Sequence, residues 1–257
     1  MKRTDYDKIA HLYDERARDH VADEALLDFL STRGSFRQST PCVLDVGCGA
    51  GKQLAANHER LSGVAFVGID RFQGMLRIAR QRCPEIAWIQ ADGASLPLVS
   101  QACDYATSQF SYPHVRNTAG LLNEIFRVLR PGGRFVMTNI DPWSMTNWAI
   151  YRYFPEALAL DCQDFLPVGQ FLDLMRAVGF QGVSARQEER SSWRDAEEFL
   201  AFASDRHRAS QLMAISNEAY TAGLQRLIRD TQLRSNFISQ FVLVTITGDK
   251  CRPRFTD

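Results

Sequence analysis

The chain has 257 residues, with 30 basic and 30 acidic side chains and a formal net charge of zero. Nucleic-acid-binding proteins usually carry a basic excess, so this balance disfavours that class of partner. No apolar run approaches the roughly 20 residues that cross a bilayer, and the charged N-terminus lacks a signal-peptide core. Six cysteines without a CxxC pair fit reduced thiols better than a disulfide framework or a zinc site. We therefore expect a cytoplasmic protein with no metal, no membrane span and no nucleic-acid partner.

The first elements are predicted between residues 5 and 31, where apolar side chains recur at helical spacing. Leu26, Phe29 and Leu30 fall on one face of such a helix, and Gly34-Ser35 ends it. We expect one or two amphipathic helices here, which form a helical lid over residues 1–35.

A glycine-rich turn between a strand and a helix is the most informative stretch of the chain. Val43, Leu44 and Val46 form a short apolar run typical of a buried strand, and a helix is expected from 53 to about 60. The turn between them reads Gly47-Cys48-Gly49-Ala50-Gly51. Glycines let a ligand lie against the main chain and leave N–H groups aimed at it. The spacing fits neither the dinucleotide fingerprint nor a phosphate-binding loop with Gly-Lys-Ser/Thr.

The pattern Asp45-x-Gly47-x-Gly49-x-Gly51 resembles motif I of the class I S-adenosylmethionine (SAM) methyltransferases of the type 11-like, small-molecule kind. The resemblance implies that this loop wraps the methionine half of SAM, with contacts from Asp45, Gly47, Cys48, Gly49 and Gly51. The phrase Tyr6-Asp7-x-Ile9-Ala10-x-x-Tyr13-Asp14 is similar to an N-terminal helix that folds over the cofactor in this family. By that similarity Tyr13 contacts SAM and Tyr6 contacts the substrate; a plain packing helix is the alternative.

Acidic residues follow the next two predicted strands. Asp70 ends the strand 65–69, and a carboxylate there has two oxygens that can accept both ribose hydroxyls. The strand 86–90 leads to Asp92-Gly93, which resembles the adenine-binding motif of the family. The resemblance implies that Asp92 accepts the exocyclic amine and that Gly93 offers a backbone N–H. Arg71, beside Asp70, is also assigned to the cofactor.

The strand predicted at 103–107 opens into a polar and aromatic segment. Because the carboxyl ends of parallel strands form the ligand crevice, this segment is expected to face the transferred methyl group. Gln109 is assigned to the cofactor, and Phe110 and Tyr112 are assigned to the substrate. His114 is a candidate general base, since the ordinary pKa of a histidine side chain lies near neutrality; a structural or substrate-contacting role is the alternative. The segment has no Asn/Asp-Pro-Pro-Tyr, which disfavours amino-group methylation of DNA or of protein release factors.

The second half of the chain is predicted to close the sheet and to carry two insertions. An amphipathic helix from 121 ends at Pro131-Gly132-Gly133 and leads into strand five, which resembles the family's segment after the motifs. Residues 141–168 are expected to form an aromatic cap that stacks a planar acceptor; a satellite cluster or a dimer contact is the alternative. The cap residues assigned to the substrate are Trp143, Trp148, Tyr151 and Arg152. A helix at 169–178, a strand at about 183–188, a helical insertion at 193–235 and a closing strand at 236–248 follow.

These observations predict one α/β domain over residues 1–257, with a Rossmann-like three-layer sandwich. We expect a seven-stranded mixed sheet whose last strand is antiparallel, a SAM-binding core at 40–140 and helical lid insertions. The predicted activity is methyl transfer from SAM to an O, N or C atom of a small, planar acceptor, which leaves S-adenosylhomocysteine. RNA or protein methylation, quinone-ring C-methylation and a non-catalytic SAM-binding module remain open alternatives, and so does a homodimer.

Overall fold

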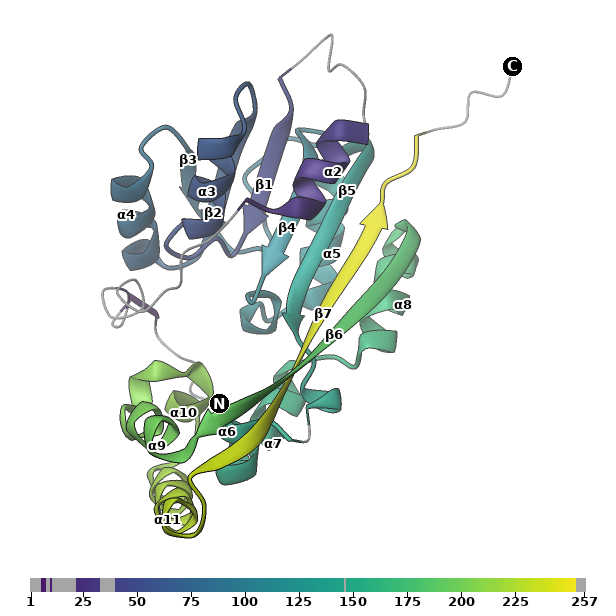
Figure 1. Ribbon diagram of the computed structural model, residues 1–257. Helices are drawn as coiled ribbons and strands as arrows, with labels where there is room; N and C mark the ends of the chain where they lie inside the picture. The colour runs from purple at the N-terminus through teal and green to yellow at the C-terminus, as the bar shows by residue number, and fades with distance from the viewer. Residues whose placement is uncertain (1–5, 8–9, 11–21, 33–39, 146, 253–257) are drawn as a thin grey trace. The chain divides into compact units, whose positions relative to one another are not determined.

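The computed structural model describes residues 6–7, 10, 22–32, 40–145 and 147–252 (Figure 1). Its contacts divide the chain into two compact units. The first, here called the core unit, comprises 6–139, 169–186 and the chain from 245. The second, here called the appended unit, comprises 140–168 and 187–244. Tyr13 lies outside the described residues.

The core unit is built on parallel strands. Its strands are β1 (Cys42–Val46), β2 (Ala65–Asp70), β3 (Ala87–Gln90), β4 (Cys103–Gln109) and β5 (Leu129–Ile140). β1 pairs in parallel with β2 and β4, so that Leu44 lies opposite Val67 on one side and Ala106 on the other. β1 and β4 are almost entirely buried, as expected for central strands of a sheet covered on both faces, although β4 carries several polar residues.

Helices make the crossovers that parallel strands require. They are α3 (Lys52–Arg60) after β1, α4 (Gln73–Arg82) after β2 and α5 (Thr118–Val128) after β4, with the 3₁₀ helix η1 (Tyr112–His114) before α5. α2 (Glu24–Thr32) comes before β1, and α8 (Val168–Val178) comes before β6. Apolar residues of α2, α3 and α4 pack with β1, β2 and β4 in one core cluster that includes Leu26, Leu54, Leu76 and Tyr105.

The remaining strands, β6 (Gln181–Asp195) and β7 (Asn236–Asp249), complete a seven-stranded sheet of order β3-β2-β1-β4-β5-β7-β6. The Lys250 N–H donates to the Gly133 carbonyl and the Asp141 N–H donates to the Val242 carbonyl, so β7 runs antiparallel to β5 (Figure 1). The predicted α/β fold with a mixed seven-stranded sheet is confirmed.

Several boundaries differ from the sequence-based expectation. α5 ends at Val128, and β5 already begins at Leu129, before Pro131-Gly132-Gly133. Proline disfavours the helical conformation of the residue before it, here Arg130, which explains the earlier end of the helix. β6 is longer than the predicted 183–188; most of it is exposed and polar, so it shows no apolar alternation by which it could be recognised.

The appended unit consists mainly of short helices. They are the 3₁₀ helix η2 (Pro142–Ser144), α6 (Ala149–Tyr153), α7 (Pro155–Asp164), α9 (Ala196–Ser204), the 3₁₀ helix η3 (Arg206–Arg208), α10 (Ser210–Ala214) and α11 (Asn217–Leu233). Within the helical insertion predicted at 193–235, α10 and α11 are separate helices. The Ser216 side chain accepts a hydrogen bond from the Ala219 N–H and caps α11. Within the described residues, every helix is too short or too polar to span a bilayer.

Candidate active site

The glycine turn between β1 and α3 has a left-handed backbone at all three glycines, with φ of 82° at Gly47, 52° at Gly49 and 74° at Gly51. A Cβ atom on Gly47 would lie 2.3 Å from Cβ of Ser111, and one on Gly51 would lie 2.5 Å from the Trp88 ring. A Cβ atom on Gly49 would meet nothing within 4 Å. The first and third glycines are therefore needed for packing, whereas Gly49 borders open space at the carboxyl edge of the sheet.

Asp70 ties the end of β2 to this turn. Its Oδ2 accepts the Gly49 N–H at 2.8 Å and its Oδ1 accepts the Phe72 N–H at 2.8 Å. Burial raises the pKa of the carboxyl group, while the backbone N–H groups of Phe72, Gly49 and Arg71 oppose that shift by stabilising the charge. Each carboxylate oxygen can accept two hydrogen bonds, so these two bonds leave acceptor capacity for a ligand hydroxyl.

Asp45 lies at the end of β1 and is only 4% exposed. Its Oδ1 has no hydrogen-bond partner among the described residues. Burial raises the pKa of the carboxyl group to about 8, and the nearby charges of Asp70 and Asp23 add to the shift. Asp45 is thus a buried acid beside the turn, and its contact with a cofactor stays a prediction.

The other two residues assigned to the cofactor around the turn behave differently from each other. Cys48 packs against the core cluster, and burial holds the pKa of its thiol well above the usual range, so it is an unreactive small side chain. Arg71 is exposed, and its guanidinium lies 5.3 Å from the centroid of the Phe72 ring.

Asp92 and Gly93 follow β3. The Asp92 side chain is exposed, and its Oδ1 accepts the Ala94 N–H at 2.9 Å, which makes a local turn. A Cβ atom on Gly93 would lie 3.0 Å from the Val46 side chain. The turn therefore sits beside the end of β1, as adenine binding at this edge requires, but the assignment of these two residues stays a prediction.

The end of β4 presents one accessible aromatic ring. Phe110 has a left-handed φ of 52°, uncommon outside glycine, and is 48% exposed. The Phe110 N–H donates to the Thr138 carbonyl. The hydroxyl of the next residue, Ser111, donates to the Val46 carbonyl at 2.8 Å. Gln109 is half-buried at the same strand end. The fixed backbone thus turns a large apolar side chain toward solvent.

Tyr112 is placed differently from Phe110. It is buried, and its ring packs edge-on against Phe171 at a centroid distance of 4.9 Å. This is the environment of a core residue, and a substrate contact by Tyr112 stays a prediction.

The N-terminal segment reaches the same region. The Tyr6 hydroxyl lies 3.2 Å from Nε2 of His114, and the Tyr6 ring contacts Phe72 at a centroid distance of 5.3 Å. Asp7 accepts the Gly74 N–H at 2.6 Å at the start of α4. Sequence reasoning named Tyr6 and His114 separately and missed their pairing, because 108 residues separate them in the chain.

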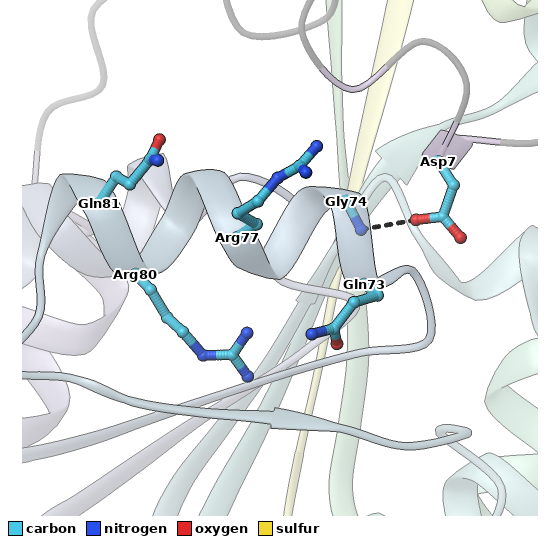
Figure 2. Close-up of a pocket in the computed structure, with 6 residues that line it drawn as sticks. All are labelled: Asp7, Gln73, Gly74, Arg77, Arg80 and Gln81. Carbon is cyan, nitrogen blue, oxygen red and sulfur yellow. Dashed lines mark hydrogen bonds between the residues drawn. The ribbon is translucent and has the colours of Figure 1, made fainter.

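A depression of about 620 Å³ lies beside α4 and is lined by Asp7, Gln73, Gly74, Arg77, Arg80 and Gln81. Figure 2 shows Arg77 and Arg80 projecting from different sides of the helix, so the two guanidinium groups do not converge on one ligand. The Arg80 guanidinium donates instead to the Trp88 carbonyl at 3.1 Å. This depression includes none of the glycines of the turn, and we assign it no chemistry.

Residues 44–137, which hold the glycine turn and the strand ends, match the family model described as "Methyltransferase domain". This region is a class I SAM-dependent methyltransferase domain. The predicted family, enzyme class and cofactor are thereby confirmed at the level of the family.

The relatives of this chain have unlike acceptors in their names. A demethylmenaquinone methyltransferase of Beutenbergia cavernae is 30% identical over 157 residues, which are 58% of this chain and 62% of that protein. A malonyl-[acyl-carrier protein] O-methyltransferase of Marinomonas is 26% identical over 197 residues, 75% of this chain and 71% of that protein. The structure of Haemonchus contortus phosphoethanolamine N-methyltransferase 2 with SAM shares the fold, with a TM-score of 0.61, 18% identity and coverage of 96% of this chain and 57% of that one.

The aromatic residues assigned to the cap lie in the appended unit, outside the matched region. The Tyr151 hydroxyl donates to Asp161 at 2.6 Å, and the Trp148 ring contacts both Tyr151 and Phe241. The Arg152 guanidinium lies 5.6 Å from the Phe237 ring. These contacts hold the unit together, whereas Trp143 is 49% exposed. The substrate role of all four stays a prediction, for which Trp143 has the most accessible surface.

Sequence reasoning missed the neighbours that shape the turn. Ser111 fills the space beside Gly47, and Trp88 fills the space beside Gly51. No pattern in the sequence pairs these residues, since each contact depends on which strands are neighbours. The Asp7 contact with α4 had a weak signal, because an aspartate often accepts hydrogen bonds from a helix N-terminus.

Proposed function

We propose that the protein transfers the methyl group of SAM to a small, planar organic acceptor. SAM supplies an electrophilic methyl group on a sulfonium ion, so the transfer needs aligned reactants more than it needs a strong catalyst. The observation that carries the proposal is the open space beside Gly49 in the glycine turn. The Gly49 N–H donates to the Asp70 carboxylate.

The residues at the strand ends fit such a cofactor. The turn from Gly47 to Gly51 would hold the methionine half, and the remaining acceptor capacity of Asp70 would hold the ribose. The turn at Asp92-Gly93, beside the end of β1, would hold the adenine. The protein's own contribution is to fix this edge in advance: Asp70 orders the turn, and Ser111 and Trp88 pack the glycines on either side.

A base is needed only for an acceptor that keeps its proton until attack. His114 is the candidate, and the Tyr6 hydroxyl at 3.2 Å from Nε2 would fix the orientation of its ring. In this proposal Tyr6 is a positioning residue. An acceptor with an acidic hydroxyl would make both residues dispensable.

The accessible ring of Phe110 supports a planar acceptor, since aromatic rings stack well against flat molecules. A quinone ring is the favoured specific candidate, because the Beutenbergia relative is named for demethylmenaquinone. Methylation of RNA is less consistent with the formal net charge of zero.

Calorimetric titration with SAM and with S-adenosylhomocysteine tests cofactor binding. In Gly49→Val the side chain would enter the open space, so we expect the affinity for both ligands to fall at least about 100-fold. Gly63→Val is the matched control, because Gly63 also has a left-handed φ, of 71°, and open space around it but lies before β2, away from the turn. Equal losses in the two variants would mean that backbone strain, and not cofactor contact, explains the effect.

Turnover with labelled SAM then separates an enzyme from a binding module. The acceptors to compare are a demethylmenaquinone analogue, a malonyl thioester and phosphoethanolamine. We expect methylation of the quinone, with a higher KM in Phe110→Ala and an unchanged KM in Val99→Ala, a control at a residue that is 77% exposed. Binding of SAM without label transfer to any of the three, or to small molecules of a cell extract, would contradict the proposed enzyme.

A further inference from the structure

Two cysteines lie together at the amino-terminal edge of the parallel sheet. Cys42 is the first residue of β1 and Cys103 is the first residue of β4. The strands are neighbours, and Val43 pairs with Tyr105. This edge is opposite to the glycine turn, which follows the carboxyl end of β1, so the pair is separate from the proposed cofactor site.

The geometry of the pair suits a covalent bond. The two Sγ atoms are 3.4 Å apart, and both thiols are free. The strand register places the residues diagonally across neighbouring strands, which corresponds to a Cα separation of about 5.8 Å from the standard strand spacings. Disulfides span Cα separations of about 4.4 to 6.8 Å and have an S–S bond of about 2.05 Å. Closing the bond thus needs the two sulfurs to approach each other by about 1.4 Å.

The surroundings give the two thiols different characters. The Asp104 carboxylate accepts the Cys42 N–H at 3.0 Å and pairs with the Arg130 guanidinium. The hydrogen bond between the two thiols, aided by the charge of Arg130, lowers the pKa of Cys42 despite partial burial. The same contact, together with burial, raises the pKa of Cys103. Cys42 is half-buried and Cys103 is fully buried, so Cys42 is both the better nucleophile and the more accessible sulfur.

We propose that Cys42 and Cys103 form a reversible intramolecular disulfide when the protein meets a hydroperoxide. The Cys42 thiolate attacks one peroxide oxygen, the O–O bond breaks, and the departing hydroxide takes up a proton to become water. Cys42 is then a sulfenic acid. The sulfur of Cys103 attacks the sulfur of Cys42, and its proton leaves with the sulfenic hydroxyl group as a second water. Two thiols are oxidised and one hydrogen peroxide is reduced to two waters.

The bond would tie the beginnings of β1 and β4, which are 61 residues apart in the chain. A cross-link that closes a loop of this length restricts the unfolded chain, so oxidation is expected to raise Tm by about 5 °C or more. SAM affinity is expected to stay within about two-fold of that of the reduced protein, since the pair lies at the edge away from the turn.

The test is peroxide treatment of the full chain, followed by alkylation of free thiols, digestion and mass spectrometry. We expect a linked peptide that contains Cys42 and Cys103 in most molecules, together with the rise in Tm, and both reversed by dithiothreitol. Both results are expected to vanish in Cys42→Ser and in Cys103→Ser and to persist in Cys83→Ser, a matched control at another buried cysteine.

Three results would overturn the proposal. The first is oxidation of Cys42 to sulfinic acid without a linked peptide, and the second is a link to any other cysteine. The third is a rise in Tm that Cys103→Ser retains. Because the linked peptide is measured in the unaltered protein, a variant that folds poorly does not prevent the test, and a failure of SAM binding would leave its outcome unchanged.

Discussion

The two compact units use polar and aromatic residues in different ways. In the core unit, Asp70 at a strand end holds backbone N–H groups, and Gly49 beside it borders open space. In the appended unit, Tyr151 donates to Asp161, and rings such as Trp148 pack on other rings. The core unit therefore leaves hydrogen-bond acceptors and open space for a ligand. In the appended unit, by contrast, many of the polar groups and rings contact one another. An aromatic-rich segment is for this reason a weaker sign of a binding site than a glycine turn that follows a strand.

The largest effect on SAM affinity is expected from Asp70, whose carboxylate lies at the end of β2 beside the glycine turn. Asp70→Asn removes the charge and one of the two acceptor oxygens, so SAM affinity should fall about 100-fold, as expected for loss of a charged hydrogen bond. Asp104→Asn is the matched control, because Asp104 is a buried carboxylate at the opposite edge, with 6% exposure against 8% for Asp70.

Calorimetric titration and thermal unfolding of both variants make this comparison. Asp104→Asn should lower Tm, because Arg130 loses its charged partner, while SAM affinity stays within about two-fold. Comparable losses of affinity in the two variants would remove Asp70 from the cofactor site.

A glycine in the appended unit should show the opposite behaviour to Gly49. A Cβ atom on Gly223 in α11 would lie 2.1 Å from the fully buried Phe154 ring. Gly223→Ala should therefore reduce the free energy of unfolding by about 1–3 kcal/mol through overpacking, with SAM affinity unchanged. Urea unfolding checks the stability. Gly169→Ala is the control, since a Cβ there would meet nothing within 4 Å, and it should be neutral or slightly stabilising.

The sequence was sufficient to predict the α/β fold and its mixed seven-stranded sheet, but not the contacts inside the predicted insertions. Short apolar runs, alternating glycines and strand-end acids are local signals, and they identified β1, β2 and the turn between β1 and α3. The partners that shape the turn, Ser111 and Trp88, depend on which strands become neighbours, and no local pattern reports that.

The aromatic cap shows the same limit more strongly. Tyr151 and Trp143 look equivalent in the sequence, as two large rings in one short segment. In the structure Tyr151 is 3% exposed and bonded to Asp161, whereas Trp143 is 49% exposed. The difference lies in the partners that folding gives each ring: Tyr151 reaches Asp161 of α7, ten residues further along the chain, and its ring also contacts Trp148. Which of these rings meets an acceptor therefore has to be measured.

The smallest expected effect is on the pH dependence of stability. It concerns Asp45, which lies at the same sheet edge as Asp70. Burial raises the pKa of Asp45 to about 8 in the folded protein, against about 3.9 in an unfolded chain. The folded state then keeps a proton that the unfolded state releases. The stability that this proton contributes is fully present below the pKa of the unfolded state. It is lost as the pH rises from about 4 through about 8, with no further change above that.

Urea unfolding at pH 6 and pH 7 tests this sign. The unaltered protein should lose about 1 kcal/mol more stability over that unit of pH than Asp45→Asn does, because the amide cannot titrate. The comparison uses the slope with pH, so any general loss of stability in the variant cancels. Equal slopes would show that Asp45 is ionised in the folded state, and its unpaired Oδ1 would then need a cation or an ordered water beside the glycine turn.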